Sequence, residues 1–129
     1  MNRPEQDIQI AVCEHLGLRA EPRVFWFHVP NAGKRSNFVG KKLCDSGLIS
    51  GVPDLVILMD GRMYCLELKA PQGKLTPSQR LVMERMRDCG AQVAVAKSID
   101  EALVTLECWG VIKRSVSHRV PEAVGARGT

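Results

Sequence analysis

The 129-residue sequence lacks the long apolar segments and the leader that would point to a membrane or to secretion. No apolar run reaches the roughly 18 residues that a membrane-spanning helix needs. The N-terminal stretch MNRPEQDIQI does not show the basic segment followed by an apolar one that marks a signal peptide. With 45% hydrophobic and 25% charged residues, the composition is that of an ordinary globular domain. We therefore expect a cytoplasmic protein with one core.

The sequence also lacks the patterns of a zinc site and of a nucleophile-based catalytic site. Its five cysteines are odd in number and widely spaced, and no CxxC or HxxxH pair is present. We therefore expect reduced cysteines that belong to the core. The histidines, His15, His28 and His118, are isolated from one another and are interpreted as structural or surface residues. No Ser/His/Asp grouping and no glycine-rich phosphate-binding loop stands out.

Hydrophobic periodicity and turn residues divide the chain into helices and strands, with no internal repeat. Helices are expected at residues 4–17, 36–46, 77–89 and 98–109, and strands at residues 24–29, 54–59, 62–69 and 92–96. Asp60-Gly61, between two strand-like runs, predicts a β-hairpin. Thr76, Pro77 and Gln79 predict a capping box at the start of a helix. The element order predicts an α/β fold, a central mixed β-sheet flanked by helices.

The predicted hairpin brings three charged side chains to its open end. If Asp60 and Gly61 form the loop, Asp54 lies opposite Glu67, and Lys69 shares their face. Facing carboxylates repel each other, and their burial is costly. A divalent cation would remove both costs, and oxygen ligands suit Mg²⁺ or Mn²⁺. Such a site activates water for attack on a phosphoryl group; the alternative is a simple salt bridge between Lys69 and either acid.

Two helical residues are expected to point toward the same region. Glu5 shares the apolar stripe of the first helix with Ile8 and Val12, which makes it a candidate third carboxylate. The alternative for Glu5 is a favourable interaction with the helix dipole. Gln79 lies on the apolar face of its helix, where its amide either contacts the site or a bound phosphate, or serves the capping box alone.

Basic residues are clustered along a chain whose net charge is +4. Four of them fall within nine residues that contain no acid: Lys34, Arg35, Lys41 and Lys42. Residues 111–129 carry four basic residues against Glu122 alone, and we interpret this segment as a basic tail outside the domain. Each cluster is either a DNA-phosphate contact or a solvated surface.

The sequence resembles a nuclease family in motif order and spacing. PD, twelve residues and ELK resemble the PD-(D/E)xK signature, and HVPNAGKRS, SGVPDLVIL, ELKAPQGKLTPSQ and CGAQVAVAKSIDEAL resemble the VRR-NUC family of virus-type replication and repair nucleases over about residues 5–106. The resemblance implies a restriction-endonuclease-like fold over residues 1–110 and Mg²⁺- or Mn²⁺-dependent phosphodiester hydrolysis. It carries the catalytic roles to Asp54, Glu67, Lys69 and Gln79, and the metal-ligand roles to Glu5, Asp54, Glu67 and the backbone carbonyl of Leu68.

Compact members of this family come from phages and bacteria and resemble dimeric Holliday-junction resolvases. We therefore expect a structure-selective DNA endonuclease, acting as a homodimer on branched or four-way DNA in a bacterial or phage-infected cytoplasm. A sequence-specific restriction-type enzyme is less favoured, because 129 residues leave little room for a recognition insert. The intact Asp54, Glu67 and Lys69 argue against a dimeric DNA-binding module that no longer cuts. Candidate interface residues are Phe38, Leu43, Leu48, Ile49, Val24, Phe25 and Trp26.

Overall fold

The computed structural model describes residues 3–30 and 46–114. Their elements are α1 (Arg3–Arg19), β1 (Val24–His28), β2 (Leu55–Met59), β3 (Arg62–Leu68), α3 (Pro77–Asp88), β4 (Gln92–Ala96) and α4 (Ile99–Trp109). The strands form one mixed sheet in the order β1-β2-β3-β4, with the first two pairings antiparallel and the third parallel. The predicted α/β class is confirmed. The helix expected at residues 36–46 lies almost entirely outside the described residues.

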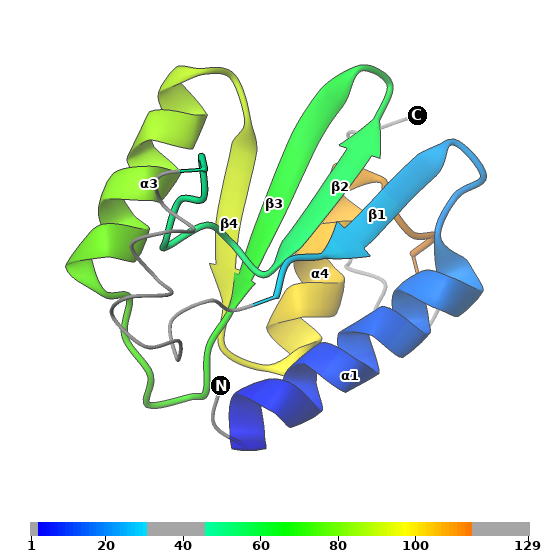
Figure 1. Cartoon of the computed structure of the whole chain (residues 1–129). Coiled ribbons are helices and arrows are strands. Elements are labelled where there is room, and N and C mark those ends of the chain that lie inside the picture. The colour runs from blue at the N-terminus through cyan, green and yellow to red at the C-terminus, as the bar shows by residue number, and fades with distance from the viewer. Residues whose placement is uncertain (1–2, 31–45, 115–129) are drawn as a thin grey trace, which may run out of the picture.

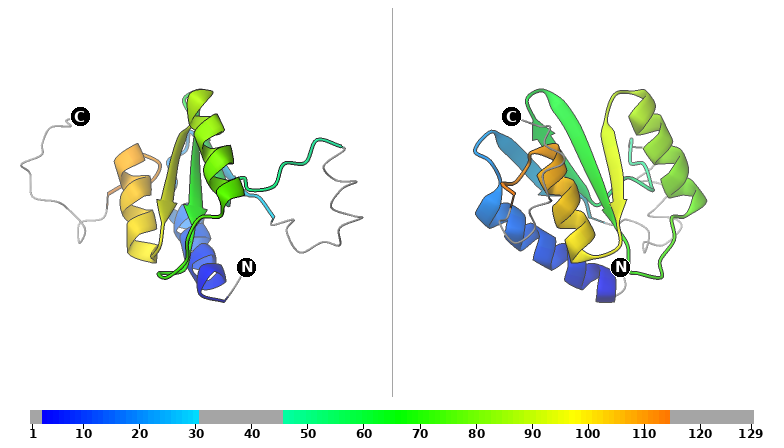
Figure 2. Two further views of the ribbon diagram at one scale, coloured as in Figure 1. Left: turned by 90° about the vertical axis from the view of Figure 1, so that its left-hand side faces the viewer. Right: turned by 180° about the vertical axis from the view of Figure 1, so that it is seen from behind.

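The two faces of the sheet are covered by different helices (Figure 1). Helices α1 and α4 lie against one face, and α3 lies against the other, as the edge-on view in Figure 2 shows. The larger core cluster joins α1 and α4 to the sheet through residues such as Val12, Leu66 and Leu106. The smaller cluster joins α3 to the opposite face through Met83 and Cys65. The core therefore has two layers, which is what a sheet with an apolar surface on both faces requires.

The hairpin between β2 and β3 has the register expected from its turn. Asp60 and Gly61 both have positive φ values, 55° and 77°, as a two-residue hairpin loop with the right-handed strand twist requires. Met59 pairs with Arg62, and Ile57 pairs with Tyr64. This register continues toward Asp54 and Glu67 at the open end of the hairpin.

The chain remains packed on the core beyond α4. Val111 and Ile112 are fully or almost fully buried. Arg19, at the end of α1, forms an ion pair with Glu107 at 3.1 Å and donates a hydrogen bond to the carbonyl oxygen of Lys113 at 2.7 Å. The packed chain thus extends past residue 110, which is where the sequence suggested that the domain ends.

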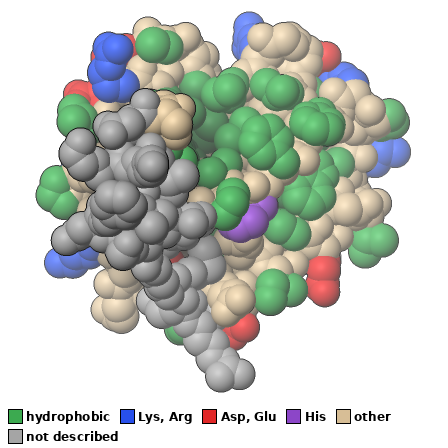
Figure 3. Space-filling model, in the orientation of Figure 1, with side chains coloured by type: hydrophobic (Ala, Val, Ile, Leu, Met, Phe, Trp, Pro, Cys, Tyr) green, Lys and Arg blue, Asp and Glu red, His purple; other side chains and the backbone are tan. Residues whose placement is uncertain are grey.

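Helix α3 covers only part of its face of the sheet. The uncovered part carries a row of cross-strand neighbours, Phe25, Leu58 and Met63, which are 63%, 40% and 38% exposed. Hydrophobic side chains gather visibly on this side of the molecule (Figure 3). Phe27 lies next to Phe25 on the same face, with ring centroids 6.0 Å apart.

Candidate active site

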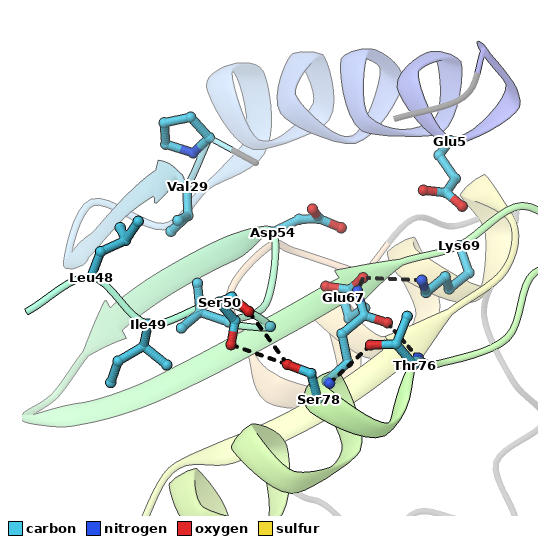
Figure 4. Close-up of a pocket in the computed structure, with 14 residues that line it drawn as sticks. Glu5, Val29, Leu48, Ile49, Ser50, Asp54, Glu67, Lys69, Thr76 and Ser78 are labelled. Carbon is cyan, nitrogen blue, oxygen red and sulfur yellow. Dashed lines mark hydrogen bonds and ion pairs between the residues drawn. The ribbon is translucent and has the colours of Figure 1, made fainter. Parts of the chain in front are cut away.

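A pocket of about 360 Å³ opens where β2 begins and β3 ends. All the acids, the lysine and the glutamine selected from the sequence line it: Glu5, Asp54, Glu67, Lys69 and Gln79. They come from α1, from the segment before β2, from β3 with the residue after it, and from α3 (Figure 4). The fold therefore brings together side chains that are up to 74 positions apart in the sequence.

Asp54 is held in place by the backbone of the neighbouring strand. Its Oδ2 atom accepts a hydrogen bond from the backbone N–H of Leu68 at 2.9 Å. Burial raises the pKa of Asp54, and the negative charge of Glu5 raises it further, while the Leu68 hydrogen bond acts in the opposite direction. The hydrogen bond from Leu68 therefore orients the Asp54 carboxylate but does not fully offset the cost of desolvating its charge.

Glu67 and Lys69 are both buried charged residues, at 3% and 8% exposure. Lys69 Nζ lies 3.8 Å from Glu67 Oε2, so the salt bridge considered from the sequence is present. This ion pair does not compensate the acid fully, because Glu67 Oε1 is buried without a hydrogen-bond partner. Burial, and then the charge of Asp54, raise the pKa of Glu67 from 4.5 to about 8 despite the opposing effect of Lys69.

Gln79 serves both roles that the sequence left open. Thr76 and Gln79 form the predicted capping box, in which Gln79 Oε1 accepts from the Thr76 backbone N–H at 2.9 Å. The same side chain donates from Nε2 to Glu67 Oε2 at 3.0 Å. Because the capping contact occupies the amide oxygen, the amide nitrogen is directed at the acid. The start of α3 therefore positions Glu67.

Two replacements separate these roles. Gln79→Glu keeps a capping-box residue but places a second carboxylate against Glu67, so we expect a near-native melting temperature and DNA cleavage slowed about 10-fold or more. Gln79→Ala removes both contacts, so we expect the same loss of rate together with about 1 kcal/mol of stability. Thermal melting and single-turnover cleavage measure the two effects. A Gln79→Glu enzyme as fast as wild type would mean that the contact with Glu67 is structural only.

The site fits a divalent cation held mainly by two carboxylates. Asp54 and Glu67 provide hard oxygen atoms, and the unpartnered Glu67 Oε1 is an acceptor that a cation would satisfy. Among residues 3–30 and 46–114, no three His, Cys, Asp or Glu side chains converge closely enough to form a metal site by themselves. Glu5 lines the same pocket, and its Oε2 accepts from the backbone N–H of Ala70 at 3.5 Å. Mg²⁺ commonly keeps several waters, so a two-carboxylate site is chemically sufficient.

His28 and Gly51 are also neighbours of the site, which the sequence did not predict. His28 Nδ1 lies 3.3 Å from the carbonyl oxygen of Asp54, and a positive charge on the ring lowers the pKa of that acid. Gly51 has a φ of 90°, and a Cβ atom there would lie 2.7 Å from Ser78 Oγ. Only glycine permits this approach to α3 without displacement. The isolated histidine and the Gly51-Val52-Pro53 break carried no signal of either contact.

Several other candidates from the sequence are either outside the described residues or outside the pocket lining. Lys34, Arg35, Lys41 and Lys42, selected as DNA-binding residues, are outside the described residues, as are Phe38 and Leu43. His15 Nδ1 accepts a hydrogen bond from Arg19 Nη1 at 3.1 Å, and His15 is not among the residues that line the pocket. No helix in the described ranges is long and apolar enough to span a membrane.

A mixed sheet that presents two acids and a lysine at the end of a hairpin defines an α/β nuclease domain of the PD-(D/E)xK class. The chain belongs to the VRR-NUC domain family, whose family model matches residues 3–100. One similar solved structure, described as a VRR_NUC domain protein, is 18% identical, with a TM-score of 0.69 and coverage of 93% of this chain and 99% of that one. Another, a VRR_NUC domain, is 22% identical, with a TM-score of 0.57 and coverage of 82% and 97%. At these identities the structures show a shared fold. Among curated proteins, none matches this chain.

Proposed function

We propose that this nuclease domain is an endodeoxyribonuclease that hydrolyses phosphodiester bonds with Mg²⁺ or Mn²⁺. The observation that carries the proposal is the pair formed by the half-buried Asp54 and the buried Glu67, with one Glu67 carboxylate oxygen unpartnered, beside Lys69 in an open pocket. The ion pair with Lys69 engages Glu67 Oε2 and leaves Oε1 for a further positive group. The arrangement is costly for folding alone, and cation binding would offset that cost.

The residues of the site divide the work. A bound cation would lower the pKa of a coordinated water and offset charge on a phosphoryl oxygen. Asp54, fixed by the Leu68 N–H, and Glu67, fixed by Gln79, would hold that cation, with the Leu68 carbonyl and Glu5 as further candidates. Lys69 lines the pocket, where its ammonium group can donate to the scissile phosphate or orient the attacking water.

The metal requirement tests the proposal directly. Cleavage should stop in excess chelator, and Mg²⁺ or Mn²⁺ should restore it, because the donor set is oxygen. Ca²⁺ should bind without supporting turnover. The measurement is cleavage of labelled linear, flapped and four-way DNA with each ion. Undiminished cleavage in chelator would contradict the mechanism.

The same panel of substrates separates the alternatives. A structure-selective enzyme cuts branched DNA faster than linear DNA of any sequence, whereas a restriction-type enzyme cuts one linear sequence, and a non-cutting module cuts none. We favour selectivity for branched or four-way DNA. The elements of the described residues form one fold with no inserted recognition domain among them. Lys34, Arg35, Lys41 and Lys42 remain the proposed phosphate contacts.

We further propose a homodimer, since symmetric incision of two strands needs two sites related by a two-fold axis. Of the candidate interface residues, Phe25 is exposed, whereas Val24 and Trp26 pack against the core and Leu48 and Ile49 line the pocket. The exposed row of Phe25, Leu58 and Met63 is therefore a better candidate for the interface than the set of residues selected from the sequence.

Light scattering at micromolar concentration tests the assembly. The wild type should be a dimer, and Phe25→Asp should weaken association by at least about 10-fold because a charge would be buried at the interface. Leu18→Asp is the matched control, since Leu18 is 87% exposed on α1. If the wild-type protein stays monomeric, the proposal of a resolvase-like homodimer is wrong, while the nuclease assignment stands.

A further inference from the structure

The active-site pocket has an apolar end as well as a charged one. Leu48, Ile49 and Val29 gather at one end, and Glu67, Lys69 and Glu5 lie at the other, with Asp54 between them (Figure 4). Leu48 and Ile49 are 37% and 60% exposed, and they line the same pocket as the carboxylates. Exposed aliphatic side chains inside a catalytic pocket contribute nothing to metal binding or proton transfer. Their position therefore suits contact with an apolar group of the bound molecule.

The apolar end is fixed relative to the carboxylates. The backbone N–H of Val29 donates to the carbonyl oxygen of Asp54 at 2.8 Å, which ties that wall directly to the acid. On the other side, Ser78 Oγ donates to the carbonyl oxygen of Ser50 at 3.5 Å, and the two serine hydroxyl oxygens are also 3.5 Å apart. Gly51 permits the close approach of this segment to Ser78. Both walls are thus attached to the elements that carry the chemistry.

Resting on the proposed endonuclease function, we propose that the apolar end of the pocket binds the nucleobase of an unpaired nucleotide adjacent to the scissile phosphate. The outside of a DNA duplex presents phosphates and sugars, which offer aliphatic side chains little apolar surface. The flat apolar face of a base becomes accessible only when that base is unstacked and unpaired. The pocket has a charged end that suits a metal ion and an aliphatic wall at the other end. It therefore accommodates the scissile phosphate together with the base of the adjacent nucleotide.

This assignment gives the pocket a part in choosing the substrate. In continuous duplex the base must be unpaired and unstacked at an energetic cost, whereas at a branch point, flap or single-stranded end that cost is small. Productive binding is therefore favoured at discontinuities without any reading of sequence. Leu48, Ile49 and Val29 are the specificity-determining residues for unpaired DNA.

A cycle of protein and DNA changes tests the contact. Abasic residues are placed, one at a time, at the two nucleotides on each side of the mapped cleavage point of a flapped DNA, and single-turnover kcat/KM is measured with Mg²⁺ or Mn²⁺. One abasic position should slow the wild type about 10-fold. Ile49→Ser should slow cleavage of the intact DNA by a similar factor and should show little further loss with that abasic DNA, because the two changes remove the same contact.

Matched variants keep the test decisive. Leu48→Ser repeats it if Ile49→Ser melts early, and Leu81→Ser, at a 62% exposed position of α3 outside the pocket lining, should retain the full abasic penalty. The inference is overturned if no abasic position slows the wild type, or if both pocket variants keep the full penalty. It is also overturned if these two variants convert a dimer to a monomer and cut all substrates equally slowly. Leu48 and Ile49 would then contact a second copy of the chain instead of a base.

Binding measured by fluorescence anisotropy in Ca²⁺ distinguishes this inference from the function on which it rests. The same coupling in binding, without cleavage in Mg²⁺ or Mn²⁺, would uphold the base-binding pocket and refute the endonuclease. Cleavage without coupling in either measurement would overturn the pocket and leave the endonuclease standing.

Discussion

Asp54→Ala, Glu67→Ala and Lys69→Ala should each cut DNA at least about 100-fold more slowly than the wild type, while DNA binding is largely retained. The two acids are the side chains that fit a cation, and Lys69 is the buried ammonium group beside them. Each change removes an interaction that acts on charge developing in the transition state. The measurement is single-turnover cleavage at saturating protein, with affinity determined separately by anisotropy in Ca²⁺.

Exposed residues of the same charge provide the controls for these variants. Glu84→Ala on α3 and Lys97→Ala after β4 change the net charge equally at exposed positions outside the pocket lining. They should cut at rates close to that of the wild type. Melting curves exclude unfolding, and Glu67→Gln, which preserves size, should be as defective as Glu67→Ala. Near wild-type cleavage rates in any of the three site variants would mean that the proposed set of catalytic residues is wrong.

The affinity of the site for Mn²⁺ should rise about 10-fold for each pH unit between pH 6 and pH 8, and then level off. Burial and the charge of Asp54 raise the pKa of Glu67 to about 8, so a proton competes with a cation for this acid at neutral pH. A cation must displace that proton, so the apparent affinity follows the ionised fraction. Isothermal titration across this range measures it.

The same pKa predicts how the stability of the metal-free protein depends on pH. The folded pKa of Glu67, about 8, lies above its ordinary value of 4.5, so the folded state binds the proton more tightly than the unfolded state. This contribution to stability is complete below pH 4.5 and is lost as the pH rises toward 8. Melting temperature should therefore fall across this window, by about 4 °C for each kcal/mol lost, and Mn²⁺ should restore more of it at pH 8 than at pH 6.

Glu67→Gln is the control for both pH effects, because an amide does not titrate. In this variant the pH dependence of Mn²⁺ affinity and of the metal-free melting temperature should flatten over the same range. If the wild type has a flat melting temperature from pH 5 to pH 8 and a pH-independent affinity for Mn²⁺, the site does not hold a proton that a cation must displace.

The sequence by itself determined those features that depend on local geometry. Asp60-Gly61 selects a two-residue hairpin loop, and the resulting register brings Asp54 and Glu67 to the same end with no other information. The capping box of Thr76 and Gln79 is likewise contained within four residues. These predictions succeeded because period and turn chemistry act over short distances along the chain.

The tertiary structure decided which surfaces meet. Periodicity showed that Gln79 faces inward, but only the packing of α3 on the sheet directs its amide at Glu67 and leaves Glu67 Oε1 unpartnered. The pairing of β1 with β2 places Val29 and His28 against Asp54 across 25 and 26 positions of sequence. An apolar stripe predicts that one face of a helix is buried, but it does not predict which element that face packs against. The burial of Glu67, and the apolar wall in the same pocket, therefore arise from long-range packing alone.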